Sequence, residues 1–193
     1  MRNRILGIDP GSRITGYAIL DRHGSDSTAA CCDVIPFSQK EPSLERLRIL
    51  YSRVTNIISL YKPDYCAIET PVYGKDPSAM LKLGRAQAAI IMAVLHQDIP
   101  LFEYYPKAVK KAITGRGNAN KEQVAYMLYK LISITEDKLP SDATDALAVA
   151  WCLSQKLRDP SGNHVHSPDM PAKRNRNTWA SFIENHPDRI HKK

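Results

Sequence analysis

A short stretch near the start of the chain, from Ile5 to Leu20, most constrains the possible fold. Two apolar runs rich in strand-forming residues flank the turn sequence Pro10-Gly11-Ser12, which predicts a β-hairpin. The first predicted strand ends in Asp9. An ionised carboxylate beside apolar neighbours loses hydration, which a metal ion, a cation or several N–H donors must replace. Asp9 could instead have a purely local role, because an Asp before Pro-Gly can form an Asx turn with the following backbone.

Length and composition predict one soluble domain with an appended tail. The chain has 193 residues, of which 43% are hydrophobic, enough for the core of a single domain. We expect that domain over residues 1–157 and a flexible basic tail over 158–193, where Pro, Asn, His and Arg are frequent and apolar periodicity is lacking. The longest apolar run, Ala88 to Leu95, is too short to span a bilayer. The four cysteines lie in apolar segments without metal-ligand spacing, which indicates reduced, buried thiols and a cytoplasmic protein.

The net charge favours a polyanionic partner. It is +7 at pH 7, and the isoelectric point is near 9.2. Residues 157–193 hold seven basic and four acidic residues and so contribute +3, while the rest of the chain contributes +4. Because this excess is mild, charge alone does not separate a nucleic-acid-binding protein from other basic proteins.

Hydrophobic periodicity and turn signals predict a mixed α/β protein. After the hairpin we expect strands at 28–37, 65–68 and 101–105, and helices at 44–61, 78–96, 106–113, 121–132 and 142–157. Ser43 and Asn120 are the expected N-caps of the first and fourth of these helices. The order indicates three antiparallel strands, followed by crossover units whose strands run parallel to the first.

The helix expected at 78–96 is apolar on nearly every side. Such a helix is either buried all round or covered by another subunit. A core helix is the plainer interpretation, and a subunit interface is the more specific one.

Four acidic residues form the candidate catalytic group. Glu69 follows a predicted strand as Asp9 does, and functional groups gather at the carboxyl ends of parallel strands. Asp142 and Asp145 lie three residues apart on one face of the first turn of the last helix, although acidic residues also favour helix N-termini on electrostatic grounds alone. If all four converge, they repel one another, and two Mg²⁺ or Mn²⁺ ions would neutralise them. Sites that hold two such metal ions catalyse the hydrolysis of phosphodiesters.

Four ordered motifs resemble those of the bacterial RuvC Holliday-junction resolvases, which have a ribonuclease-H-like fold. They lie between about Arg4 and Leu153 and read Gly7-Ile8-Asp9-Pro10-Gly11-Ser12, Ala67-Ile68-Glu69, Leu81-Lys82-Leu83-Gly84 and Asp142-Ala143-Thr144-Asp145-Ala146-Leu147-Ala148. The resemblance implies a structure-specific endonuclease that resolves four-way DNA junctions by paired symmetric nicks during recombination and repair. It also implies that two Mg²⁺ ions, for which Mn²⁺ can substitute, are bound by the catalytic residues Asp9, Glu69, Asp142 and Asp145.

The same resemblance implies partners and DNA contacts. It predicts a homodimer formed through the helix at 78–96, and a RuvA–RuvB branch-migration complex as a partner. Lys110 and Lys121 match two lysines that assist the reaction in the family. Arg116 lies between two glycines just before a helix, where a cation and free N–H groups can bind phosphate. No membrane is expected as a partner.

The chain departs from the family pattern in two places. Three residues after the strand-end Glu, where the family often has a DNA-stacking Phe, this chain has Val72. We expect the neighbouring Tyr73 to stack on bases instead. The tail beyond residue 157 matches no motif.

Three other classes of function start from the same residues. Actin-like and sugar-kinase ATPases open with a similar hairpin, but they need two related domains, and this chain has no second phosphate hairpin. A noncatalytic DNA-binding module would leave four carboxylates without a role near phosphate. A nuclease of the same fold with a different nucleic-acid substrate is closer, and residues alone do not exclude it.

Overall fold

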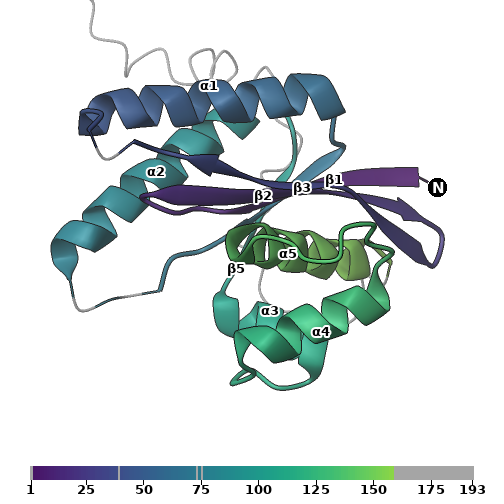
Figure 1. Ribbon diagram of the computed structural model, residues 1–193. Coiled ribbons are helices and arrows are strands. Elements are labelled where there is room, and N and C mark those ends of the chain that lie inside the picture. Colours follow the sequence, from purple (N-terminus) through teal and green to yellow (C-terminus); the bar gives the residue numbers. More distant parts are fainter. Residues whose placement is uncertain (1, 39, 73, 75, 159–193) are drawn as a thin grey trace, which may run out of the picture.

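A mixed five-stranded sheet lies at the centre of the protein, with helices on both faces (Figure 1). The computed structural model describes residues 2–38, 40–72, 74 and 76–158. The strand order is β3-β2-β1-β4-β5. The strands are β1 Arg2–Asp9, β2 Ile14–His23, β3 Asp26–Pro36, β4 Tyr65–Glu69 and β5 Leu101–Tyr104.

The strand directions confirm the predicted mixed α/β fold. β2 pairs antiparallel with both β1 and β3, and β4 pairs parallel with both β1 and β5. The parallel pairs follow from the crossover helices, because a helix between two strands returns the chain to the same end of the sheet.

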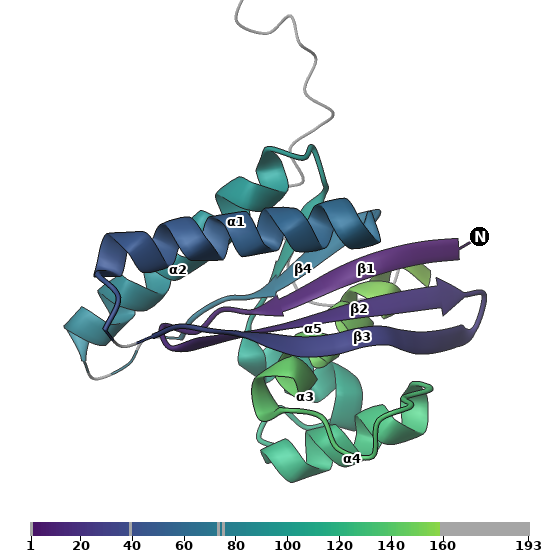
Figure 2. The same cartoon turned by 45° about the horizontal axis from the view of Figure 1, so that its top comes forward.

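Within the described residues, five helices lie on the two sides of the sheet. Helices α1 Ser43–Tyr61 and α2 Pro77–Leu95 lie together on one face, and α5 Ser141–Arg158 lies against the other (Figures 1 and 2). Helices α3 Pro106–Thr114 and α4 Lys121–Leu131 pack beside α5 on its side of the sheet. The described chain therefore forms three layers, with the sheet in the middle.

Alternation along β1 divides the core into two halves. Ile5 belongs to the half beneath α5, whereas Leu6 and Ile8 belong to the half beneath α1 and α2. The position after Ile8 therefore turns back toward α5, and this position is Asp9.

The two predicted helix caps have different outcomes. Asn120 caps α4 as expected, in a capping box completed by the side chain of Gln123. The prediction for Ser43 is wrong, because Pro42 occupies the N-cap position and Ser43 is already helical. The Pro42 carbonyl accepts the first helical N–H bond, from Arg46 at 3.1 Å, and no side chain caps this end of α1.

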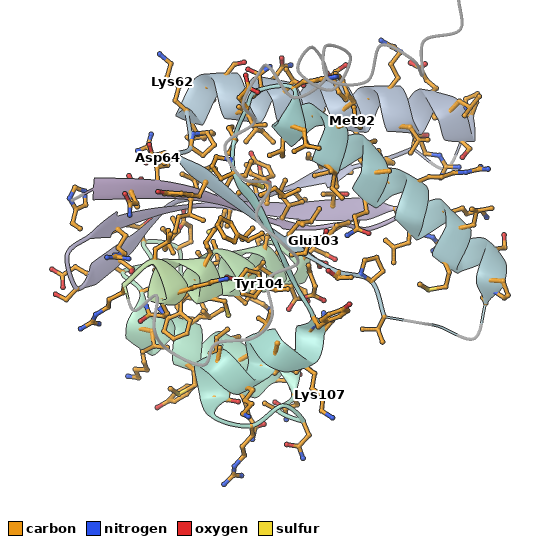
Figure 3. The ribbon with its side chains drawn as sticks, turned by 180° about the vertical axis from the view of Figure 1, so that it is seen from behind. Lys62, Asp64, Met92, Glu103, Tyr104 and Lys107 are labelled. Carbon is orange, nitrogen blue, oxygen red and sulfur yellow. The ribbon has the colours of Figure 1, made fainter. Side chains whose placement is uncertain are left out.

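Helix α2 is buried on one side only. Ala86, Ile90, Ala93 and Val94 face the core, while Met92 on the other side is 45% exposed (Figure 3). Within the part of the chain that the structure describes, α2 is the one helix whose length and apolar composition match a membrane span. That match is weak evidence, because core helices of soluble proteins have the same length and composition.

All four cysteines are free. Cys66 and Cys152 are buried as predicted, whereas Cys31 and Cys32 are only half-buried. The flexible basic tail expected over residues 158–193 lies almost entirely outside the described residues, which end at Arg158.

Candidate active site

Asp9 and Glu69 end neighbouring parallel strands. The register pairs Gly7 with Ala67 and Ile8 with Ile68, so Asp9 and Glu69 occupy the next position of each strand. Ile8 and Ile68 both belong to the core half beneath α1 and α2. Because side chains alternate along a strand, the two carboxylates point to the opposite face, toward α5.

The first turn of α5 lies in backbone contact with this part of the sheet. Gly16, which pairs with Asp9 across the hairpin, is so close to α5 that an added Cβ would lie 1.9 Å from the Asp142 carbonyl oxygen. A Cβ on Gly7 would lie 2.1 Å from the Ala146 carbonyl oxygen. Only glycine permits such an approach, which brings the turn that carries Asp142 and Asp145 beside Asp9.

The end of β4 is held by its neighbour β5. The Thr70 N–H donates to the Tyr104 carbonyl oxygen at 2.8 Å, immediately after Glu69. The side chains of Thr70 and Gln87 both donate to Glu103, which lies next to Tyr104 on β5 (Figure 3). These bonds fix the direction in which Glu69 leaves the sheet.

The site is strongly acidic and partly shielded from water. Burial, followed by the negative charges of Asp145 and Asp142, raises the pKa of Asp9 to about 7. Burial, followed by the charges of Asp9 and Asp145, raises the pKa of Glu69 to about 8. The surroundings therefore disfavour the ionised form of both carboxyl groups unless a cation is present.

Lys121 supplies one such cation. Its ammonium group donates to Asp145 Oδ2 at 2.6 Å and to the Ser141 hydroxyl at 3.3 Å. It lowers the pKa of both Asp9 and Glu69, and the Asp145 carboxylate in turn raises the pKa of Lys121. The sequence predicted a role for Lys121 but did not identify Ser141 as its second partner.

The donor set suits a hard divalent cation, although the side chains are not arranged around one. The group offers only carboxylate oxygens, which Mg²⁺ and Mn²⁺ prefer. Across residues 2–38, 40–72, 74 and 76–158, no three His, Cys, Asp or Glu side chains lie close enough together to hold a metal ion. In this conformation Asp145 is bonded to Lys121, so coordination by all four carboxylates requires side-chain movement.

The other residues that the sequence predicts to contact DNA differ in how they relate to the four carboxylates. Lys110 on α3 is close enough to lower the pKa of Glu69. Arg116 is exposed in the turn between α3 and α4 and shows no side-chain contact with the four carboxylates. Val72 is 59% exposed, and Tyr73 lies outside the described residues.

Three basic residues for which the sequence predicted no DNA contact line a cleft beside the hairpin turn. They are Arg13 in the turn itself, Arg46 on α1 and Lys82 on α2. Arg46 and Lys82 each lie four residues before the first buried residue of their helix, Leu50 or Ala86. A basic residue at the start of an apolar stripe is the signal that could have identified them.

Comparisons with known proteins agree with this arrangement. Residues 5–153 match the family described as crossover junction endodeoxyribonuclease RuvC. The chain is 41% identical over 186 residues to the protein of that name from Salinibacter ruber, covering 96% of this chain and 98% of the relative. The structure of Thermus thermophilus RuvC superposes with a TM-score of 0.74 at 29% identity, over 82% of this chain and 96% of that one. For T. thermophilus RuvC in complex with a Holliday junction substrate the TM-score is 0.72 at 30% identity, over 77% and 90%.

The mixed sheet, with acidic residues at the ends of two central parallel strands and a helix start packed against them, places the protein among the ribonuclease-H-like nuclease folds. The family match extends over most of the described chain. The chain belongs to the RuvC family of crossover junction endodeoxyribonucleases.

Proposed function

We propose that this protein resolves four-way DNA junctions by introducing paired symmetric nicks, as an endonuclease of DNA recombination and repair. The observation that carries the proposal is the meeting of Asp9 and Glu69, on adjacent strand ends, with the first turn of α5. The relative from T. thermophilus with the same fold has been observed in complex with a Holliday junction substrate. The basic net charge of +7 suits a polyanionic substrate of this kind.

The four carboxylates, Asp9, Glu69, Asp142 and Asp145, are the proposed ligands of two Mg²⁺ ions, for which Mn²⁺ can substitute. When bound, the ions activate a water molecule and stabilise the leaving 3′ oxygen in an in-line displacement at phosphorus. The protein contributes position, because strand ends and a helix start are rigid supports. The raised pKa values of Asp9 and Glu69 express the same preference for a cation.

The basic residues around the carboxylates have a separate proposed role. Lys121, with a side chain that is 63% exposed, is within reach of solvent and of a phosphate at the site. Lys110 approaches the site from α3, and Arg116 extends the basic surface along the neighbouring turn. We expect Tyr73 to contribute base stacking, in place of the family's Phe.

The exposed side of α2 supports the proposed homodimer. Five small or apolar residues form a stripe along it, which we call the α2 stripe: Leu81, Gly84, Ala88, Met92 and Leu95. Nothing lies within 4 Å of a Cβ built on Gly84, so no described part of this chain requires a glycine there. A second copy packed on the α2 stripe would hold two active sites at a fixed separation, as paired nicks require.

Two expectations concern the cellular setting. We expect the protein to act in the cytoplasm, where junction DNA is found in bacteria. The RuvA–RuvB branch-migration complex is the expected partner that delivers the junction. Both rest on membership of the family.

A cleavage assay with synthetic DNA tests the proposed function. The protein is incubated with a four-way junction or with linear duplex of the same sequence, in Mg²⁺ or in EDTA. We expect symmetric nicks in the junction alone and only with Mg²⁺. Asp9→Asn should abolish nicking while binding persists, and Asp26→Asn, which changes an exposed carboxylate at the opposite end of the sheet from Asp9, should leave nicking unchanged.

Other results would favour the other classes of function. ATP hydrolysis without DNA cleavage would indicate an ATPase. Junction binding without nicking in any divalent cation would indicate a binding module. Equal cutting of linear duplex would indicate a nuclease with a different substrate.

A further inference from the structure

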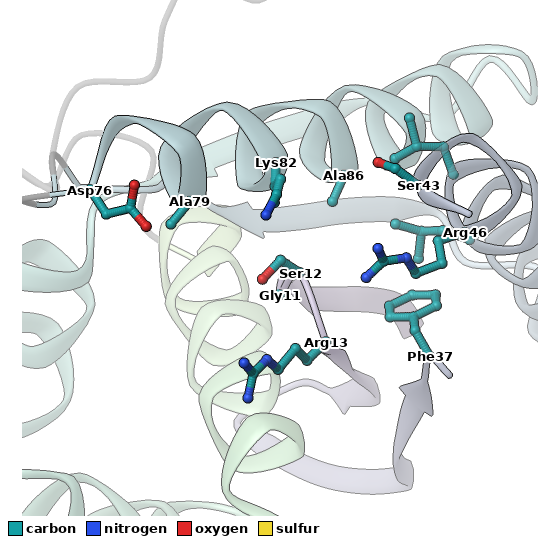
Figure 4. Close-up of a pocket in the computed structure, with 12 residues that line it drawn as sticks. Gly11, Ser12, Arg13, Phe37, Ser43, Arg46, Asp76, Ala79, Lys82 and Ala86 are labelled. Carbon is teal, nitrogen blue, oxygen red and sulfur yellow. The ribbon is translucent and has the colours of Figure 1, made fainter. Parts of the chain in front are cut away.

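A cleft lies beside the turn that joins β1 to β2. It has a volume of about 430 Å³ and is bounded by this turn, by the start of α1 and by the first half of α2. Figure 4 shows Arg46 and Lys82 extending from the two helices toward Gly11 and Ser12. The cleft therefore brings together three segments that are far apart in the sequence.

The charges on the cleft wall favour an anion. Three basic residues line it, Arg13, Arg46 and Lys82, against one acidic residue, Asp76. The Asp76 carboxylate already accepts the Ser78 N–H at 2.8 Å as the cap of α2. The net charge of the side chains that line the cleft is +2, and the one negative charge among them already caps α2.

Arg46, which lines this cleft, carries a donor without a partner in the described part of the chain. Its Nε atom is buried, and it has no hydrogen-bond partner among the residues that the structure describes. A buried guanidinium N–H without an acceptor is unfavourable, so such groups normally have a partner. A phosphate oxygen is a suitable acceptor, because guanidinium and phosphate match in charge and in geometry.

The start of α1 adds further donors. Ser43, its first residue, lines the cleft, and no side chain caps this end of the helix. The first N–H groups of a helix are free to bind an anion, and the helix dipole favours negative charge there. Glu45 in the same turn does not line the cleft and is ion-paired with Arg48.

The turn on the other wall is held rigidly. Thr15 is fully buried, and its hydroxyl bonds to both the N–H and the carbonyl of Gly11 at 3.3 Å. The Phe37 N–H donates to the Arg13 carbonyl at 3.0 Å. An anion in the cleft would thus be held at a constant position relative to Asp9, two residues before Gly11.

We propose that this cleft binds one backbone phosphate of the DNA substrate, with Arg46 and Lys82 as its main contacts and Arg13 at its rim. The proposal rests on the proposed function. The cleft lies on the α1 and α2 side of this turn, whereas the Asp9 side chain points toward α5, so the bound phosphate belongs to a different linkage from the one that is cut. Because the same turn carries both, the bound phosphate would fix how the DNA strand runs past the active site.

The salt dependence of junction binding tests this assignment. The variants are Arg46→Gln, Lys82→Gln and the double variant, with Arg53→Gln as a control that removes an exposed charge from α1 away from the cleft. The slope of log K against log salt should become shallower by about 1 for the double variant, because the cleft neutralises one phosphate, and by less for each single variant. Arg53→Gln should keep the wild-type slope.

A neutral linkage in the DNA identifies the phosphate. Methylphosphonates are placed singly at the linkages around the cut in the junction. One position should weaken binding by the wild-type protein, have a smaller effect on Arg46→Gln, and have no further effect on the double variant, which lacks both main contacts. Arg46→Lys, which keeps the charge, should recover part of the lost affinity, and it replaces Arg46→Gln if that variant does not fold.

The outcomes separate this proposal from the proposed function. If Arg46→Gln and Lys82→Gln bind with the wild-type slope while the wild-type protein nicks junctions, the cleft is not a phosphate site and the function stands. If the wild-type protein neither binds nor nicks junctions, the function itself fails. A methylphosphonate effect that is equally large in wild type and Arg46→Gln also overturns the assignment.

Discussion

The ammonium group of Lys121 lies 2.6 Å from Asp145 Oδ2, although the two residues are 24 positions apart in the sequence. This contact joins the start of α4 to the start of α5. It places a fixed positive charge among carboxylates that otherwise repel one another. A cation is thus part of the site before any substrate arrives.

Replacing Lys121 should affect function much more than stability. Its ion pair with Asp145 is largely exposed on the lysine side, and such pairs contribute at most about 1 kcal/mol. We expect Lys121→Met to unfold within about 1 kcal/mol of wild type in urea, but to nick junctions at least about tenfold more slowly. Lys130→Met, at the other end of α4, is the matched control and should nick normally. Normal nicking by Lys121→Met would remove this residue from the site.

The stability of the metal-free protein should depend on pH through Asp9. Its pKa rises from the ordinary value of 3.8 to about 7, so between these values the folded state binds more protons than the unfolded state. The contribution of Asp9 to the free energy of unfolding therefore falls as the pH rises from about 4 to about 7. Urea titrations in EDTA should show wild type losing on the order of 1–3 kcal/mol relative to Asp9→Asn over that range. A difference that stays constant or grows with pH would contradict the raised pKa.

Gly16→Ala should displace the start of α5. The new Cβ would lie 1.9 Å from the Asp142 carbonyl oxygen, and neither backbone can move without breaking strand or helix bonds. We expect a loss of about 2–4 kcal/mol in the free energy of unfolding, as for overpacked core sites, together with slower nicking. Ser52→Ala, at an exposed position within α1, is the control and should not lower stability, because alanine is the better helix former. Wild-type stability of Gly16→Ala would mean that α5 is not held this closely.

A charge on the α2 stripe should separate the proposed dimer. Met92→Lys places a charge in the middle of the stripe, where a partner copy would bury it at considerable cost. Light scattering should give a dimer for wild type and a monomer for Met92→Lys, and the monomer should nick one strand at a time. Leu60→Lys, at a residue that is 72% exposed on α1, should remain dimeric. A monomeric wild-type protein would show that the α2 stripe has another role.

Most of the fold could be predicted from the sequence because its signals are local. Apolar runs rich in strand-forming residues marked the strands, and Asn120, as an N-cap residue, marked the start of α4. The positions of Asp9 and Glu69 followed from the rule that parallel strands present their carboxyl ends at one edge. Their adjacency could be tested only by the register of β1 and β4, which the structure supplies.

The remaining features depend on contacts between distant segments. Ser43 is not the N-cap of α1, because the helix begins one residue earlier than predicted. Pro42 is the N-cap, and its carbonyl accepts the first helical hydrogen bond. Composition does not predict this position. The bond between Lys121 and Asp145 depends on how α4 packs beside α5. Arg46 lies at the start of an apolar stripe, which singles it out, but the cleft that it lines forms only where the hairpin turn and α2 close the space around it.

The backbone contact of α5 with Gly7 and Gly16 has a consequence for how the protein can change over time. Because no side chain lies between helix and sheet at these points, the spacing there is set by backbone against backbone and not by the size of any side chain. Selection on these two positions therefore acts on the placement of the carboxylates directly. Two glycines, which carry no chemistry of their own, insulate the site from the rest of the interior.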